Sequence, residues 1–509
     1  FVLIFSVSLV SAQLNVPTDL PQNFVLTGIG TNGDLMGASV DFVGDIDGDG
    51  FSEIVAGAPG TYSPALANYG SAYLLDGKTG VIINTFSSTI PSTSGGAFGQ
   101  QIVNLGNIAM NINPDFLVSH PTASFGIPNA GAAYVYDTSS SVQPIYSWGG
   151  TFFGELFGAS IDNAGDITGD SINDILVGTN SFGAPAGTSG VVYLFNGATG
   201  SLIYQLMGSQ GFGVTVASLG DIDGDGFSDI AVGSPFITNS QGAVYIYSGA
   251  TGAQILQLSG GASFGSNVAN IGDYNGDGFN DLAISEVTAN SAVGIVYVYY
   301  GPAFMQQLQF NGINQGENFG MSIAGGDFNR DGFSDLVVGS NAVPGVASGR
   351  LSVYRGQALG AGNSIYTWNH PVAFYSGGAR QISVRDYNGD GFLDVLLGLP
   401  GYSSPTQPGR VEVYSLGGAW SYGSGPLTAT WTPAPNPSTN PASGTVTVTG
   451  AAFNAQGFVL CSSASANIFV SPGNNLYVNV NAPNLYQPIP ITFDSSGSWT
   501  SPLLSLQNS

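Results

Sequence analysis

Short runs of hydrophobic residues, each ended by glycine or proline, recur along most of the chain. Examples are EIVAGAP from residue 53, DILVGTN from 174 and DIAVGSP from 229. A second kind of run, such as AVYIYSG from residue 243, mixes tyrosine with aliphatic residues. Four or five consecutive β-forming residues closed by a turn residue indicate a buried strand. The pattern therefore predicts many short strands joined by glycine-rich turns.

These strands belong to a repeat of about 52 to 62 residues. An aromatic-glycine pair, as in Phe212-Gly213, precedes an acidic segment, and three units also carry Gly-x-Thr-Gly, as in residues 249–252. Four short strands per unit are typical of a propeller blade. We therefore predict an all-β fold with a seven-bladed β-propeller over residues 22–423. The acidic segments of the seven units begin at Asp45, Asn107, Asp166, Asp221, Asp273, Asp327 and Asp386.

The seventh unit lacks a clear fourth strand after Tyr414, whereas QNFVLTG from residue 22 resembles a fourth strand but precedes the first unit. A propeller whose ring stays open would leave one blade with an exposed edge. We therefore expect the segment from residue 22 to complete the seventh blade.

The two ends of the chain depart from the repeat. Residues 1–12, FVLIFSVSLVSA, form a short apolar run with small residues at its end, which predicts a signal peptide cleaved before Gln13 and truncated at its start. A hydrophobic N-terminal strand is the alternative. Residues 424–443 are rich in Pro, Ser and Thr and predict a linker. Residues 444–509 alternate in polarity, which predicts a small β-sandwich-like domain, and their abrupt end suggests that this domain is incomplete.

Charge narrows the range of partners. One lysine and six arginines stand against 32 acidic residues, and the net charge is -25. Such a chain repels nucleic acid and anionic membranes, so neither is an expected partner. No segment after the leader has the roughly 18 consecutive apolar residues of a membrane helix, so we expect no transmembrane span. The lone Cys461 excludes an intramolecular disulfide.

The acidic segment GDIDGDGFSDI from residue 220 has the ligand spacing of a cation site. Taking Asp221 as position one, aspartates stand at positions one, three, five and nine, and Gly226 at position six. Calcium takes six to eight oxygen ligands, and a glycine at position six permits the sharp bend that such a loop needs. The backbone carbonyl of Phe227 at position seven is expected to add another ligand.

An EF-hand loop begins with the same pattern. It needs a bidentate Glu at position twelve and flanking helices. Position twelve here is Val232, and strands are predicted on both sides. We therefore predict a calcium loop between strands, closed by the acid at position nine.

Six units keep this arrangement, which predicts up to six calcium sites. Asparagine at position three in the last three units supplies a neutral oxygen, so weaker binding is expected there, and the third unit has Ser171 at the glycine position. The second unit keeps only Asp115 of the acids and is predicted to have lost its site. The predicted ligands are Asp45, Asp47, Asp49, Phe51 and Glu53; Asp166, Thr168, Asp170, Ile172 and Asp174; Asp221, Asp223, Asp225, Phe227 and Asp229; Asp273, Asn275, Asp277, Phe279 and Asp281; Asp327, Asn329, Asp331, Phe333 and Asp335; and Asp386, Asn388, Asp390, Phe392 and Asp394.

Asp and Gly also favour ordinary turns, so a single loop of this kind would not demand a cation. Six of them in register make that interpretation improbable. Without cations, each loop would hold like charges a few ångströms apart, at a cost of about 1 kcal/mol per pair even in bulk water.

The repeat resembles FG-GAP repeats, the units of the seven-bladed propeller of integrin α subunits. The Phe-Gly pairs and the segment Gly57-Ala58-Pro59 carry the resemblance, over about residues 22–420. The resemblance implies structural calcium in the loops on one face of the ring and adhesion or ligand recognition on the opposite face. The chain has more candidate loops than is usual in integrins and no leg domains, so heterodimer formation is not implied.

Sequence features of an enzyme are missing. His120 and His370, the two histidines, lie in loop-like contexts beside proline and are expected at the surface, and Cys461 lies in a strand-like context where a buried thiol is the default. There is no Gly-x-Ser-x-Gly motif and no histidine cluster for zinc. We therefore predict a non-enzymatic, secreted or cell-surface recognition module with an extracellular protein or glycan ligand. The alternatives are a calcium-dependent lectin and a non-catalytic module of a polysaccharide- or lipid-degrading enzyme.

Five of the six arginines fall in the last two units. They either form an anion-binding patch or counter nearby acids singly, and the sequence leaves both interpretations open. The five are Arg350, Arg355, Arg380, Arg385 and Arg410.

Overall fold

The structure is a computed structural model of the 509-residue chain. The predicted leader at residues 1–12, Asn329, His370 and Cys461 lie outside the described residues. The described residues are 22–27, 34–63, 68–88, 90, 97–139, 143–180, 190–209, 211–237, 241–304, 307–328, 330–341, 343, 349–356, 364–369, 381–400, 409–414, 428–433, 443–449, 467–469, 477–479, 499–500 and 504–505.

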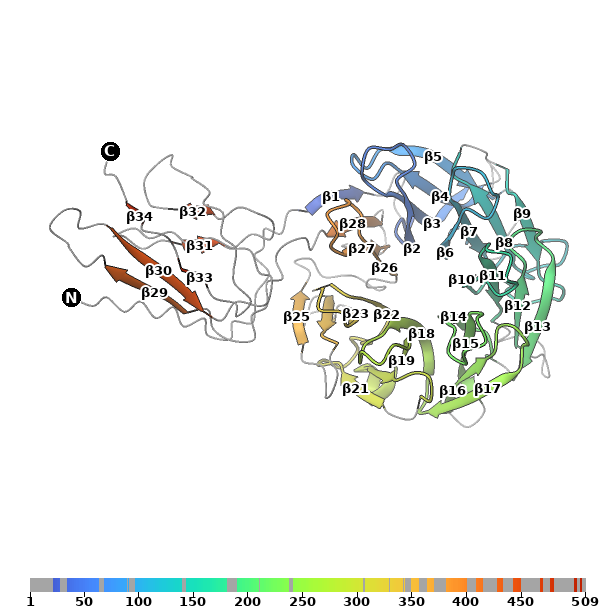
Figure 1. Ribbon diagram of the computed structural model, residues 1–509. Coiled ribbons are helices and arrows are strands. Elements are labelled where there is room, and N and C mark those ends of the chain that lie inside the picture. The colour runs from blue at the N-terminus through green and yellow to red at the C-terminus, as the bar shows by residue number, and fades with distance from the viewer. Residues whose placement is uncertain are drawn as a thin grey trace. The chain divides into compact units, whose positions relative to one another are not determined.

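Seven four-stranded antiparallel sheets follow one another around a ring in the unit formed by residues 16–415 (Figure 1). In six of them the strands pair in chain order, from the innermost strand to the strand at the rim. These strands are β2 (Ser39–Gly44), β3 (Glu53–Ser63), β4 (Asn68–Leu75), β5 (Ile82–Ser87); β6 (Ile102–Gly106), β7 (Asp115–His120), β8 (Ala132–Asp137), β9 (Tyr146–Gly149); β10 (Ser160–Gly165), β11 (Asp174–Gly178), β12 (Gly190–Phe195), β13 (Leu202–Gly208); β14 (Thr215–Gly220), β15 (Asp229–Ile237), β16 (Gln241–Tyr247), β17 (Gln254–Gly260); β18 (Phe264–Gly272), β19 (Asp281–Glu286), β20 (Ile295–Tyr299), β21 (Gln307–Asn311); and β22 (Ser322–Gly326), β23 (Asp335–Ser340), β24 (Arg350–Tyr354), β25 (Ser364–Asn369).

The seventh blade closes the ring with the first strand of the chain. It contains β26 (Ile382–Arg385), β27 (Asp394–Leu399) and β28 (Arg410–Tyr414), and β1 (Gln22–Thr27) is its outer strand. β1 pairs antiparallel with β28, with Val25 opposite Glu412. The prediction that the segment from residue 22 completes this blade is confirmed. The two ends of the propeller are thus joined by main-chain hydrogen bonds, which removes the open edge.

Helix is nearly absent from the described residues. The single helical segment, α1 (Ala289–Ala292), is one turn long and contains left-handed backbone at Asn290 and Ser291. The expected all-β, seven-bladed fold is confirmed. No helix in the described part of the chain is long and apolar enough to cross a membrane.

The hydrophobic core lies between neighbouring blades, and the aromatic-glycine pairs help to build it. Phe212 is fully buried, and its ring packs against Tyr245 and Tyr247, with centroids 5.5 and 6.1 Å away. Its backbone lies so close to Gly190 of the preceding blade that a Cβ there would stand 2.0 Å from the Phe212 carbonyl oxygen. Gly213 has φ +85°, a conformation that favours glycine. The Phe-Gly pair thus joins one blade to the blade before it.

The second compact unit comprises residues 1–15 and 416–509. Its described strands are β29 (Thr428–Pro433), β30 (Ser443–Thr449), β31 (Asn467–Phe469), β32 (Tyr477–Asn479), β33 (Trp499–Thr500) and β34 (Leu504–Ser505). β30 pairs with β29, β33 and β34, and β31 pairs with β32. β29 falls inside residues 424–443. The linker there and the sandwich-like domain over 444–509 stay predictions.

Candidate functional site

Each acidic loop connects the innermost strand of a blade to its second strand. In the fourth blade β14 ends at Gly220 and β15 begins at Asp229. The pairing shifts by one residue between Ser218 and Gly220, and Gly220 has φ +71°, so a bulge directs the chain into the loop. Because the blades share one strand order, all the acidic loops lie on the same face of the ring.

The fourth-blade loop, defined as residues 221–229, is wound around its first aspartate. Asp221 Oδ1 accepts hydrogen bonds from the backbone N–H groups of Gly224 (2.7 Å) and Asp225 (3.1 Å), and Oδ2 accepts from Gly226 (2.9 Å). Gly224 and Gly226 have φ +81° and +92°, and nothing lies within 4 Å of a Cβ built on either. Glycine is therefore favoured at these positions for its backbone conformation and not for space.

Three carboxylates converge in this loop. Asp221, Asp223 and Asp225 each place one oxygen within 4.8 Å of the others, and all three residues are exposed. In the first blade Asp45, Asp47, Asp49 and Glu53 form such a group. Hard oxygen ligands from several carboxylates are the donor set that calcium prefers. Both groups therefore fit a calcium ion.

The acid at position nine has a structural role that the sequence analysis did not foresee. Asp229 is fully buried; its Oδ2 accepts from the N–H groups of Ile222 (2.8 Å) and Asp223 (3.2 Å). Its Oδ1 accepts from Gly249 (3.0 Å), the first residue of the Gly-x-Thr-Gly turn. A Cβ at Gly249 would stand 1.8 Å from the Ser228 carbonyl oxygen. One carboxylate therefore connects the acidic loop to the Gly-x-Thr-Gly turn. That this acid also closes an ion's ligand shell stays a prediction.

Burial raises the pKa of Asp229, and the amide hydrogen bonds oppose this shift. The same burial raises the pKa of Asp281 and of Asp335, its counterparts in the fifth and sixth blades, to about 7. Asp174 accepts from Ile167, Thr168 and Gly197 in the same way. The ninth position is therefore a buried acceptor for backbone amides in these blades.

The backbone conformation and the hydrogen bonds of the other predicted loops differ from loop to loop. In the third, Ser171 at position six adopts φ 65°, so serine takes the left-handed conformation expected of glycine there. In the fifth, the Asn275 side-chain amide donates to Asp277 Oδ2 (2.8 Å). In the seventh, Asp386 Oδ2 accepts from Gly391 (2.8 Å), and Asn388 Oδ1 accepts from Asp390 (2.9 Å).

In the sixth loop an arginine side chain contacts one of the predicted calcium ligands. Arg355 Nε and Nη2 lie 2.9 and 2.6 Å from Asp331 Oδ2. Lys78 makes a longer contact in the first loop, 3.4 Å from Asp49 Oδ2. A protein cation at the fifth-position acid competes for the same negative charge as a bound ion. The contact between a protein cation and the fifth-position acid is therefore shorter in the sixth loop than in the first.

The second-blade loop, defined as residues 107–115, keeps part of the same hydrogen bonding without the acids at positions one, three and five. Asn107 Oδ1 accepts from the N–H of Asn111 (3.0 Å), and Asn111 Oδ1 accepts from Asn113 (2.7 Å). Asp115 Oδ2 accepts from Ala109 (2.8 Å), and burial raises the pKa of Asp115 to about 6. Neutral asparagines therefore suffice to form the turn, so the carboxylates of the other loops exceed what the turn requires.

The prediction that His120 lies at the surface is wrong. His120 ends β7, a strand whose residues are all buried, and its Nδ1 lies 3.1 Å from Ser88 Oγ. Burial lowers the pKa of His120 to about 4, so the imidazole is neutral. The second strand of a blade is covered on both faces by its neighbours, which the adjacent Pro121 did not indicate.

The arginines of the last two blades engage separate acids. Arg350 Nη2 lies 2.6 Å from Glu317 Oε1, and both side chains are buried. Arg410 Nε lies 2.8 Å from Glu412 Oε1. Arg355 contacts Asp331, as described above. These contacts favour the interpretation that arginines counter nearby acids singly over an anion-binding patch; Arg380 lies outside the described residues.

Comparison with known proteins agrees with the repeat. Residues 36–75 and 212–247 match the profile of the FG-GAP repeat, and residues 327–397 match that of an FG-GAP-like repeat. The chain is 35% identical over 182 residues to integrin alpha-4 of Xenopus laevis, which covers 32% of this chain and 17% of that protein. It is 30% identical over 234 residues to integrin alpha-V of Gallus gallus, which covers 41% of this chain and 22% of that protein.

The chain spans about a fifth of the length of these relatives. Among solved structures, the Dos1 propeller aligns with a TM-score of 0.43 at 13% identity, covering 72% of this chain and 76% of that one. The repeat matches, the integrin relatives and the closed seven-bladed ring agree with one another. The described strands between residues 22 and 414 form a seven-bladed propeller that resembles the FG-GAP propeller of integrin α subunits.

Proposed function

We propose that this propeller is a secreted or cell-surface recognition module that binds an extracellular protein or glycan and is stabilised by calcium in its acidic loops. One observation carries the calcium part of the proposal. The second-blade loop keeps its turn with asparagines, whereas the fourth-blade loop gathers three carboxylates within 4.8 Å. Charge that the turn does not need, and that repels itself, is accounted for by a bound cation.

The donor set fits calcium. Asp221, Asp223 and Asp225 would hold the ion in the fourth blade, and Asp45, Asp47 and Asp49 would hold it in the first. When bound, the ion supplies positive charge that cancels the repulsion and ties the loop positions together. Up to six loops are candidates, with the asparagine-containing loops expected to bind more weakly.

The recognition role is supported by similarity to integrin α subunits, adhesion receptors that carry such a propeller. No catalytic group is proposed. His120, which could act as a base, is buried and neutral. Calcium is therefore assigned a structural role, and the ligand is assigned to the ring surface away from the loops.

Two measurements test this function. Calorimetry with Ca²⁺ should show binding, and chelation should lower the melting temperature markedly; an unfolding curve unmoved by EDTA would show that the loops are only turns. The calcium-loaded chain should then be probed on a glycan array and on an array of extracellular-matrix proteins, each with and without calcium. Binding to matrix proteins supports the adhesion role, binding to glycans alone supports the lectin alternative, and binding to neither contradicts a recognition role.

A further inference from the structure

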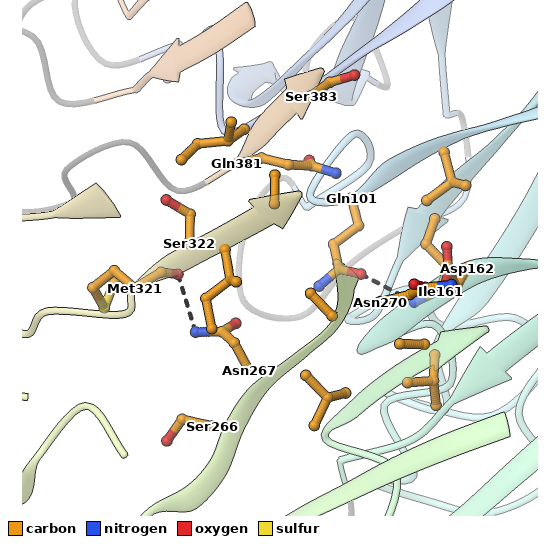
Figure 2. A pocket seen from close by; sticks show the side chains of 18 of the residues that line it. Gln101, Ile161, Asp162, Ser266, Asn267, Asn270, Met321, Ser322, Gln381 and Ser383 are labelled. Atoms are coloured by element: carbon orange, nitrogen blue, oxygen red, sulfur yellow. Dashed lines mark hydrogen bonds between the residues drawn. The ribbon is translucent and has the colours of Figure 1, made fainter. Parts of the chain in front are cut away.

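The inner strands of the blades surround a cavity of about 810 Å³ on the axis of the ring. Figure 2 shows side chains that line it, among them Gln101, Asp162, Asn267 and Gln381. A space of this volume is in the range of small-molecule pockets and is far larger than a bare ion needs. The cavity is therefore a candidate site for an organic ligand.

Two carboxylates line the cavity, Asp41 on β2 and Asp162 on β10, and its described lining contains no basic side chain. Asp41 Oδ2 accepts from the N–H of Asn104 on the next inner strand (2.8 Å). Asp162 Oδ2 accepts from the N–H of Ser218 on β14, the inner strand of the next blade (3.0 Å). The two aspartates thus occupy equivalent positions, in the first and third blades.

The strand between them, β6, carries Val103 at the matching position. The inner strands β14, β18 and β22 carry Ala217, Ala269 and Ala324 there. One side of the cavity therefore presents a carboxylate, an apolar residue and a second carboxylate in succession, and the opposite side is uncharged.

The protein does little to neutralise these two charges. Within the described residues no ion pair reaches either carboxylate, and their hydrogen bonds come from backbone amides and from the Ser383 hydroxyl, 2.7 Å from Asp41 Oδ1. Arg385 on β26 acts on Asp41 only as a weak coulombic partner. Burial raises the pKa of Asp162 to about 7, and the charge of Asp41 adds to the shift. A cation bound in the cavity would favour the ionised form of both carboxylates, because an opposite charge lowers the pKa that burial has raised.

The neutral polar groups of the lining are already engaged in joining blades. Gln101 Oε1 accepts from the N–H of Ile161 (3.0 Å), and Asn267 Nδ2 donates to the Met321 carbonyl oxygen (3.1 Å), as the dashed lines in Figure 2 mark. A ligand would therefore meet the two carboxylates as the main charged groups. In the described part of the chain, neither aspartate belongs to a group of three acidic, histidine or cysteine ligands close enough to hold a metal ion.

We propose that this axial cavity binds a linear organic dication of the alkanediamine or polyamine class. One ammonium group pairs with Asp41 and the other with Asp162, and the methylene chain between them lies along Val103. Ammonium groups bound to these partly buried carboxylates form charge-assisted hydrogen bonds, and the net charge of -25 attracts cations to the protein. This site is separate from the acidic loops and does not depend on the proposed recognition role.

The test is isothermal titration of the full chain in saturating calcium, so that the acidic loops are occupied, with 1,4-diaminobutane and spermidine as probes. Butylamine is the matched monocation. We expect the diamine to bind at least about tenfold more tightly than butylamine, and Asp41→Asn or Asp162→Asn to weaken the diamine at least about tenfold. Asp76→Asn, in an exposed turn outside the cavity lining, should leave the diamine affinity unchanged.

Ala217→Lys provides a second route that keeps both carboxylates. A lysine placed on the neighbouring inner strand should supply an internal cation and abolish diamine binding. The proposal is overturned if the wild-type chain binds neither probe or binds butylamine as tightly as the diamine. It is also overturned if the Asp162→Asn and Ala217→Lys variants both bind the diamine as tightly as the wild type. A melting temperature for each variant separates a lost site from a lost fold.

Discussion

The second-blade loop and the fourth-blade loop share hydrogen bonds at positions one and nine but differ in charge and at position six, where Gly226 has a positive φ and Ile112 does not. Asn107 and Asp221 each accept the backbone N–H of position five through Oδ1, at 3.0 and 3.1 Å. Asp115 and Asp229 each accept the N–H of position three through Oδ2, at 2.8 and 3.2 Å. The fourth-blade loop adds three clustered carboxylates to this shared framework.

The difference separates two roles that the sequence motif combines. The acid at position nine belongs to the framework, because it is buried and binds backbone amides in both loops. The acids at positions one, three and five are exposed in the fourth blade and can be replaced, as the second blade shows at position one, by a neutral side chain with the same acceptor oxygen. The framework is needed for folding, and the added charge is needed for the proposed ion.

The largest expected effect follows from the shared framework. Asp229→Ala leaves the amides of Ile222, Asp223 and Gly249 without their acceptor, and each buried amide so exposed costs about 1–3 kcal/mol. We expect a loss of about 3 kcal/mol or more in the free energy of unfolding, measured by denaturant titration with and without calcium. Asp115→Ala should also destabilise in both conditions. Asp229→Asn, which keeps one acceptor oxygen, is the control; a loss confined to calcium-containing buffer would show that position nine serves only the ion.

Calcium removal should affect the fourth-blade loop and not the second-blade loop. Free calcium at a concentration 100 times the dissociation constant of a site adds about 2.7 kcal/mol to the free energy of unfolding for that site. The combined change Asp221→Asn, Asp223→Asn and Asp225→Asn makes the fourth-blade loop resemble the second. We expect it to lower the melting temperature in calcium and to raise it slightly in chelator, because the like charges are gone. The same sign of change in both buffers would argue against a bound cation.

The converse change should build a site in the second blade. Asn107→Asp, Ala109→Asp and Asn111→Asp supply the ligands, and Ile112→Gly supplies the glycine that Gly226 provides at position six. We expect one additional calcium per chain by calorimetry, bound weakly because Asn111 lies within hydrogen-bond contact of Asp137, whose charge would repel the new acid. The variant that keeps Ile112 is the control and should gain no ion. Unchanged stoichiometry in the full variant would mean that the motif is insufficient for binding.

The smallest effect is expected in the sixth blade. Arg355 contacts Asp331 through two nitrogens at 2.9 and 2.6 Å, and partly exposed ion pairs of this kind contribute roughly 0.2–1 kcal/mol. Arg355→Ala should therefore raise the calcium affinity of that loop by no more than about fivefold. Arg385→Ala, which leaves the loop intact, is the control in the same titration. A reduced affinity would show that Arg355 supports the site instead of competing with it.

Much of the fold follows from local patterns. The runs before glycine and proline mark the strands, and the recurring acidic segments mark the loops, because both depend on residues near one another in the chain. His120 could not be placed in this way: DFLVSH has the composition of a strand, but its burial depends on the blades on either side. The triple contact of Asp229 was missed for a similar reason, since Gly249 lies 20 residues away and is brought close only when β15 and β16 pair.

The sequence by itself determined the seven units, their strand-forming runs and the spacing of the carboxylates, because turn geometry and strand burial are encoded within each unit. Tertiary structure decided what no single unit contains. The pairing of β1 with β28 closes the ring, and closure brings Asp41 and Asp162, 121 positions apart in the printed sequence, to one axial cavity. Their shared environment arises from the arrangement of separate blades around an axis, and for that reason it has no signature in either segment.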